Sequence, residues 1–115
     1  NNDSIIELSN KFSIPEGENI ILYINPHYVF TRNNKYGLCI CEKGIYWNNK
    51  SEQSRDHNLT YDDLKSRAIF LTGRSIIFNE GNVICFDGYT NETLEVYNLL
   101  RDIQNIIKLY YQNAD

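Results

Sequence analysis

NETLEVYNLLRDIQNIIKLYY, the stretch at residues 91–111, decides the fold. Its apolar side chains recur every three or four residues, which is the spacing of one face of an α-helix. They are Val96, Leu99, Leu100, Ile103, Ile106, Ile107 and Tyr110. Thr90 or Asn91 is suited to cap this helix. Because burying each apolar side chain gains about 1.5–3 kcal/mol, we expect the helix to pack on the largest apolar surface of the chain.

That surface is a predicted β-sheet. Seven short segments before the helix are rich in apolar, β-branched or aromatic residues and are separated by turn-forming residues. The segments are residues 19–24, 36–42, 45–47, 59–61, 68–72, 75–78 and 82–86. Short connections such as Lys43-Gly44 are typical of hairpins. The sequence therefore predicts a mainly β (α+β) fold, a bent antiparallel sheet or barrel of about seven strands with one C-terminal amphipathic helix.

The first residues form a smaller element of their own. In DSIIELSNKF, residues 3–12, the side chains of Ile5, Leu8 and Phe12 share one side of a short helix. The run Pro15-Glu16-Gly17 then breaks the helical pattern. We therefore divide the chain into an N-terminal helical or extended segment, residues 1–13, and one domain, residues 14–115. The sequence contains no Met, which indicates an excised fragment or a processed chain.

Several short runs resemble a bacterial pleckstrin-homology-like (PH-like) family. They are Pro15-Glu16-Gly17-Glu18, Ile20 to Tyr23, Gly37 to Ile40, Lys43-Gly44-Ile45-Tyr46-Trp47 and Leu59 to Leu64. The resemblance covers about residues 14 to 110, and it departs from the family at Cys41-Glu42, where the family often has Thr with a polar neighbour. It implies a bent sheet plugged by the C-terminal helix. It does not imply a ligand, because the ligands of these domains are mostly unknown and a fold alone does not determine function.

Composition excludes several classes of function. The net charge is −4, from 15 Asp and Glu against 11 Lys and Arg, so we expect neither nucleic acid nor an anionic membrane surface to be the main partner. No apolar run approaches the roughly 20 residues that cross a bilayer, and the polar, acidic start does not resemble a signal peptide. Three cysteines, Cys39, Cys41 and Cys85, are expected to be buried free thiols, which favours a cytoplasmic location.

No pattern of catalytic or metal-binding residues is present. The two histidines, His27 and His57, fall in predicted loops, and Cys39 and Cys41 are spaced to share one face of a strand. The adjacent carboxylates Asp62 and Asp63 are better placed to begin a short helical turn than to work as an acid–base pair. We therefore predict that the chain is not an enzyme and has no cofactor and no metal ligands.

The predicted function is binding or scaffolding, through protein–protein interaction or self-association. The aromatic-rich connection at residues 26–36 is the predicted binding site, and its residues are His27, Tyr28, Phe30, Arg32 and Lys35. The end of the long helix, Leu109-Tyr110-Tyr111, is a second candidate surface for self-association. The alternative is binding of anionic lipid through the same connection, with Arg32 and Lys35 as the cationic groups.

Overall fold

The structure is a computed structural model that describes residues 2–25, 35–79, 81–86 and 90–113. Within these residues it contains seven strands and three helices, which confirms the predicted fold class. The strands are β1 (Ile20–Ile24), β2 (Gly37–Cys41), β3 (Gly44–Asn48), β4 (Asn58–Thr60), β5 (Ile69–Thr72), β6 (Ser75–Phe78) and β7 (Asn82–Cys85). The helices are α1 (Asn2–Lys11), α2 (Tyr61–Leu64) and α3 (Thr90–Asn113).

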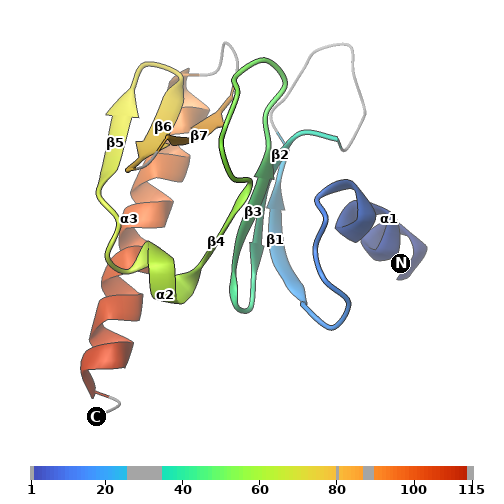
Figure 1. The fold of residues 1–115 in the computed structure, drawn as a ribbon, viewed down its shortest axis with the longest axis horizontal. Helices are drawn as coiled ribbons and strands as arrows, with labels where there is room; N and C mark the ends of the chain where they lie inside the picture. The colour runs from blue at the N-terminus through green and yellow to red at the C-terminus, as the bar shows by residue number, and fades with distance from the viewer. Residues whose placement is uncertain (1, 26–34, 80, 87–89, 114–115) are drawn as a thin grey trace.

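The strands form two antiparallel sheets in chain order. The first sheet is β1-β2-β3-β4 and the second is β5-β6-β7. Figure 1 shows α3 behind the second sheet and α1 beside β1, at opposite sides of the molecule. Strand β1 contains a bulge, because its register with β2 shifts between Ile20 and Leu22.

The main core lies between the two sheets and α3. Alternate residues of each strand point inward, so that Trp47 of β3 and Phe78 of β6 meet with their ring centroids 5.8 Å apart. The fully buried members of this core include Leu38, Ile45, Trp47, Leu64, Ile76, Phe78, Ile84 and Leu100. The contact between Trp47 and Phe78 therefore joins the first sheet to the second.

The outer face of the first sheet is covered by the N-terminal segment. Phe12 and Ile14 pack there on Cys39 and Cys41, whose side chains point away from the main core. Helix α1 ends in a Schellman motif: Ser13 has a left-handed φ of 55°, and the Ile14 N–H donates to the Ser9 carbonyl at 2.8 Å. This cap turns the chain so that Phe12 and Ile14 both reach the sheet.

Side chains of the loop between β3 and β4 cover the free edge of β7. The Asn49 Nδ2 donates to the Val83 carbonyl at 2.7 Å, and its Oδ1 accepts from the Cys85 N–H at 2.9 Å. The Ser54 Oγ accepts from the Val83 N–H at 3.0 Å. These side chains take the place of a neighbouring strand, which satisfies an edge that would otherwise carry unpaired backbone groups.

Helix α3 is fixed to α2 by a polar residue on its buried face. Gln104 is only 4% exposed, and its Nε2 donates to the carbonyls of Leu64 at 2.9 Å and Arg67 at 2.6 Å. The Leu64 carbonyl lies at the C-terminal end of α2, where helix carbonyls lack partners within the helix, and the Arg67 carbonyl lies in the segment that follows α2. At the other end of α2, the Thr60 side chain caps the helix by accepting from the Asp63 N–H.

Candidate functional site

The C-terminal half of α3 exposes apolar side chains that the periodicity assigned to the buried face. Val96, Leu100 and Ile107 are buried, but Ile106 and Tyr110 are 65% and 69% exposed, so the prediction was wrong for these two residues. Figure 1 shows that the last turns of α3 extend beyond both sheets. Leu109 is exposed beside them.

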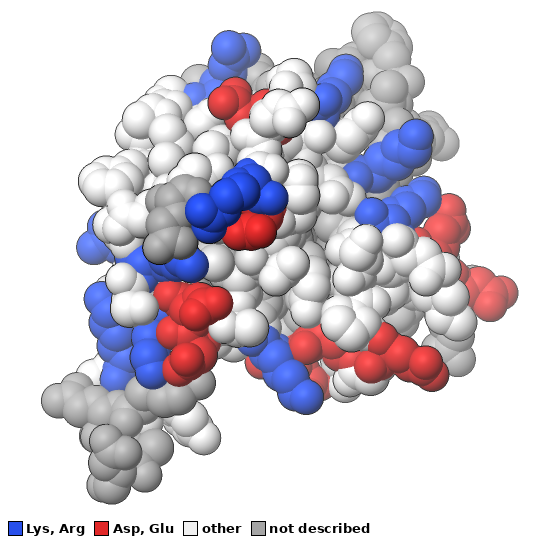
Figure 2. Space-filling model, viewed as in Figure 1, with Lys and Arg blue, Asp and Glu red and all other residues white. Residues whose placement is uncertain are grey.

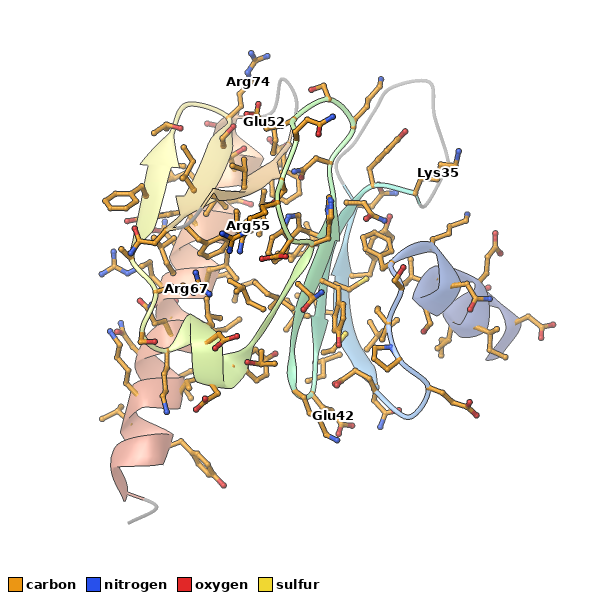
Figure 3. All side chains as sticks on the ribbon, in the orientation of Figure 1. Lys35, Glu42, Glu52, Arg55, Arg67 and Arg74 are labelled. Atoms are coloured by element: carbon orange, nitrogen blue, oxygen red, sulfur yellow. The ribbon has the colours of Figure 1, made fainter. Side chains whose placement is uncertain are left out.

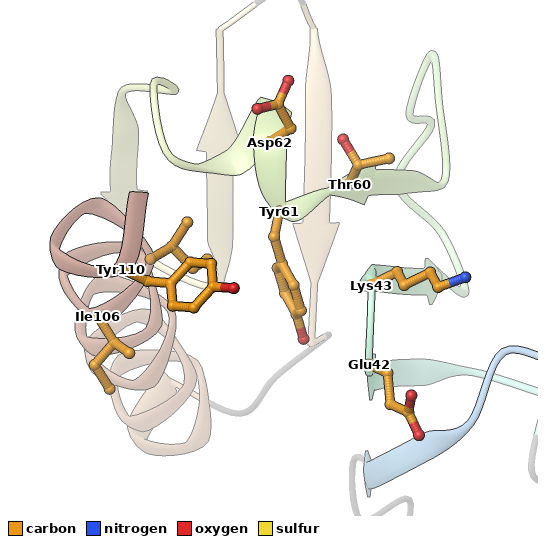
Figure 4. A pocket seen from close by; sticks show the side chains of 8 residues that line it. Glu42, Lys43, Thr60, Tyr61, Asp62, Ile106 and Tyr110 are labelled. Atoms are coloured by element: carbon orange, nitrogen blue, oxygen red, sulfur yellow. The ribbon is translucent and has the colours of Figure 1, made fainter. Parts of the chain in front are cut away.

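These side chains form one wall of a groove, which we call the α3 groove. It has a volume of about 580 Å³ and lies between α3, α2 and the turn that joins β2 to β3. Ile106, Ile107 and Tyr110 line it from α3, and Tyr61 lines it from α2. Figure 4 shows the Tyr61 ring between the helix on one side and the β2–β3 turn on the other.

The position of Tyr61 is fixed by a hydrogen bond. Its hydroxyl donates to the backbone carbonyl of Cys41, at the end of β2. The pKa of this hydroxyl is raised to about 12, mainly by burial and to a smaller extent by the neighbouring Cys41 and Glu18. The phenol therefore stays protonated at neutral pH, and it supplies the groove with a fixed aromatic surface rather than a titrating group.

Charged side chains stand at the rim of the α3 groove. Glu42 and Asp62 carry the carboxylates, and Lys43 carries the ammonium group. Asp62 pairs with Lys65 at 2.8 Å, and Glu42 accepts a hydrogen bond from Asn19 at 2.6 Å. In Figure 4 the side chains of Glu42 and Lys43 point away from the helix, so the surface between Tyr61 and α3 is mainly apolar.

The three cysteines are buried free thiols, as the sequence predicted. Burial raises the pKa of Cys39 to about 12, and Cys41 is a smaller cause. Burial likewise raises the pKa of Cys41 to about 11, with Glu18 as the smaller cause. Both thiols are protonated at neutral pH, and a protonated thiol is a poor nucleophile and metal ligand. Among the described residues, no group of three or more His, Cys, Asp or Glu is placed to hold a metal ion.

The predicted binding connection is only partly visible. His27, Tyr28, Phe30 and Arg32 lie outside the described residues. Lys35 is exposed, and in Figure 3 its side chain extends away from the sheets. It lines a cavity of about 400 Å³ together with Lys11, Asn48 and His57.

Hydrogen bonds from the Asn48 side chain to backbone carbonyls position the residues around this basic cavity. The Asn48 Nδ2 donates to the carbonyls of Lys11 at 2.8 Å and Lys35 at 3.1 Å, which fixes both basic residues at one side of the cavity. His57 lies on another side, with its Nδ1 at 3.2 Å from the Trp47 carbonyl. Three basic side chains therefore surround one cavity, next to the predicted connection.

The second candidate surface predicted from the sequence, Leu109-Tyr110-Tyr111, overlaps the α3 groove at Tyr110, whereas Ile106 and Tyr61 were not predicted to line a site. The available signal was the length of the apolar stripe: it continues to Tyr110, well past the part of the helix that seven short strands can cover. Within the described ranges, no helix combines the length and apolar character needed to cross a membrane. Comparisons with protein-family models, curated proteins and solved structures gave no significant match for this chain.

Proposed function

We propose that the chain is a non-enzymatic module with a PH-like fold that binds a segment of a protein partner in the α3 groove. The exposure of Ile106 and Tyr110 at the wall of this groove carries the proposal. Large apolar side chains that are clustered and exposed on a soluble domain mark interaction sites, because covering them removes apolar surface from water. Tyrosine at such a site adds a flat contact surface at low entropic cost.

The buried groups around the groove support binding rather than catalysis. The Tyr61 hydroxyl and the thiol of Cys41 are protonated at neutral pH, and the Tyr61 hydroxyl is engaged by a backbone carbonyl. The carboxylates of Glu42 and Asp62 are exposed and belong to separate elements. A groove with an apolar floor and a polar rim is the usual anatomy of a protein interface.

Selection from a displayed library of random peptides tests this proposal. The full chain is the bait, and the enriched peptides are then measured against Ile106→Ala and Tyr110→Ala. Leu94→Ala is the matched control, because Leu94 is an exposed apolar residue of the same helix but does not line the groove. We expect both groove variants to weaken binding at least about tenfold while the control leaves it unchanged. Peptides that bind all three variants equally well would refute the proposal.

Light scattering distinguishes self-association through the same surface from binding of a different protein. A dimer that Ile106→Ala dissociates and Leu94→Ala preserves would make a second copy of the chain the partner. A monomer at all concentrations leaves a different protein as the occupant of the groove.

The basic cavity favours a second candidate function, the binding of anionic lipid. Lys11, Lys35 and His57 surround it, although the chain as a whole has a net charge of −4. Flotation with vesicles that contain anionic lipid tests this candidate. Binding that falls with salt and is lost in Lys35→Glu would support it, and equal recovery with neutral vesicles would exclude it.

A further inference from the structure

A second groove, which we call the α1 groove, lies between helix α1 and the turn that follows it. Its volume is about 450 Å³. Ile5 and Ile6 line it from α1 and are 55% and 58% exposed, and Ile14 lines it from the turn. The Schellman motif and the buried Phe12 anchor the far end of α1, so the two isoleucines are presented by an element that is fixed in place.

The turn that forms the other wall is rigid. Gly17 has a φ of 91°, and the Glu18 N–H donates to the Pro15 carbonyl at 3.1 Å, which is the geometry of a type II turn. The Glu18 carboxylate accepts from the backbone N–H of Lys43 at 2.8 Å. The Glu18 carboxylate is therefore held beside the apolar wall, and the turn fixes the backbone of Glu16 next to it, which lowers the entropic cost for a ligand.

The charge around the α1 groove is of one sign. Among the described residues that line it, Glu16 and Glu18 are the charged ones. Residues 2–25 contain Asp3, Glu7, Glu16 and Glu18 against Lys11 alone, so four negative charges and one positive give −3 of the chain's net −4. Lys11 pairs with Glu7 at 3.0 Å. Figure 2 shows acidic side chains at the right and lower edges of this face, on the side where Figure 1 draws α1, with basic side chains next to them.

We propose that the α1 groove binds an amphipathic, cationic segment of a partner protein. Its apolar side chains would cover the exposed Ile5 and Ile6, and its Lys or Arg side chains would meet the carboxylates of Glu16 and Glu18. The charge argues against the other two occupants of an apolar groove. A second copy would place a region of charge −3 against an identical region, and an anionic membrane would repel it. This surface shares no lining residue with the α3 groove, so it stands independently of the function proposed above.

Three labelled peptides with the same leucine pattern test the proposal. They carry lysine, glutamine or glutamate at the polar helix positions, and their binding to the full chain is followed by fluorescence anisotropy at low and high salt. We expect the lysine peptide to bind most tightly and to lose affinity as salt is added. Equal affinity of the lysine and glutamine peptides would overturn the charge assignment.

Substitutions in the chain test whether the lysine peptide binds in the α1 groove. Glu16 is exposed, so Glu16→Lys leaves the fold intact, and Glu95→Lys makes the same charge change on an exposed position of α3. We expect Glu16→Lys to weaken binding of the lysine peptide at least about fivefold, and Glu95→Lys to change it less than about twofold. Ile6→Ala should weaken binding and Leu94→Ala should not. Equal losses in Glu16→Lys and Glu95→Lys would show attraction to the chain's overall charge only, and would overturn the proposal.

The two other occupants are outcomes of the same experiments. A dimer in light scattering that Ile6→Ala dissociates would replace the cationic partner by a second copy of the chain. Vesicles that bind through Ile6 but are indifferent to Glu16→Lys would replace it by a membrane surface. Either result would overturn the proposal while leaving the function of the α3 groove untouched.

Discussion

Asn49→Asp is the substitution that best tests how the two sheets are joined. The side-chain amide of Asn49 donates to the Val83 carbonyl and accepts from the Cys85 N–H, and both Val83 and Cys85 are buried. A carboxylate can still accept from Cys85, but it cannot donate to Val83. A carboxylate oxygen would then face the Val83 carbonyl oxygen where a 2.7 Å hydrogen bond now lies.

The expected loss in free energy of unfolding follows from these two hydrogen bonds. A buried polar group that loses its partner costs about 1–3 kcal/mol, and repulsion between the two oxygens adds to this. We expect Asn49→Asp to lower the free energy of unfolding by about 2–4 kcal/mol at pH about 7. Asn49→Ala removes both of these hydrogen bonds and should cost about as much. Because small domains are stable by only about 5–15 kcal/mol, either loss is easily measured.

Acid should reduce the cost of Asn49→Asp, because a protonated carboxyl group can donate to Val83. The introduced group then has a folded-state pKa above its unfolded value of about 3.9. A folded state that holds the extra proton loses stability as the pH rises through that window, so the penalty is smallest near pH 4 and largest near pH 7, both approximate. Asn105→Asp, on the exposed face of α3, is the matched control and should show about 0.5 kcal/mol or less at either pH.

Urea unfolding followed by the fluorescence of Trp47 provides the assay. Trp47 is the single tryptophan of the chain and packs against Phe78 of the second sheet, so its signal reports the junction that Asn49 supports. A penalty that is the same at both pH values, or one no larger than that of Asn105→Asp, would refute the assignment of Asn49 as a substitute for a neighbouring strand.

Three further predictions concern the same framework. Gly44→Ala should cost about 2–3 kcal/mol in urea unfolding, because a Cβ there would lie 2.4 Å from the Leu59 carbonyl oxygen of β4; a cost below that of Gly73→Ala, where the added Cβ meets open space, would contradict this. Gln104→Leu should lower the free energy of unfolding by about 1–3 kcal/mol, because it removes the donor to the Leu64 and Arg67 carbonyls. Asn105→Leu, on the exposed face, should be nearly neutral, and similar melting temperatures for the two variants would count against the role of Gln104. The raised thiol pKa values of Cys39 and Cys41 predict stability that is complete below the unfolded pKa of about 9 and falls as the pH rises towards 11 or 12; unfolding free energies that stay constant over that range would contradict the burial of these thiols.

The secondary structure was readable from the sequence because local signals agree with the fold. Glycine and asparagine mark the turns, the β-branched and aromatic runs mark the strands, and the change to a period of 3.6 residues marks the last helix. The seven predicted segments correspond to β1 through β7, and no end differs by more than one residue. Such agreement between local preference and tertiary structure is expected of a sequence that specifies a single fold.

The polar contacts that join the elements were not readable from the sequence. Asn49 belongs to a loop with no apolar residue, which favours an exposed loop, yet its amide completes the edge of a strand 34 residues away. Gln104 stands on an apolar face where the periodicity treats it as an interruption. Their roles depend on which backbone groups the tertiary structure leaves unpaired, and no local pattern contains that information.

The candidate sites likewise include one that local sequence patterns predicted and others that depend on the tertiary structure. The sequence placed binding in the connection at residues 26–36, because aromatic and basic residues gather there. The sequence indicated the α3 groove only through Leu109-Tyr110-Tyr111, because the periodic pattern assigned Ile106 to the core, and it did not indicate the α1 groove. Ile106 and Tyr110 are exposed near the C-terminal end of α3. Ile6 is exposed on α1, a helix that packs on the first sheet mainly through Phe12. Exposure of such residues depends on how long each element is relative to its neighbours, which only the assembled structure shows.

The edge strands β7 and β1 are poorly suited to pair with a partner strand, which favours binding at helices and turns. The edge of β7 is closed by Asn49 and Ser54, and β1 is bent by a bulge at Ile21, which hinders a straight strand from pairing with it. Addition of a partner strand at β7 or β1 would therefore have to displace hydrogen bonds or straighten a bulge. The α3 and α1 grooves need no such rearrangement, since their apolar side chains are already exposed on fixed helices. A partner that covers these side chains gains apolar contact without breaking any hydrogen bond of the domain, and this energetic difference favours side-chain docking over strand addition.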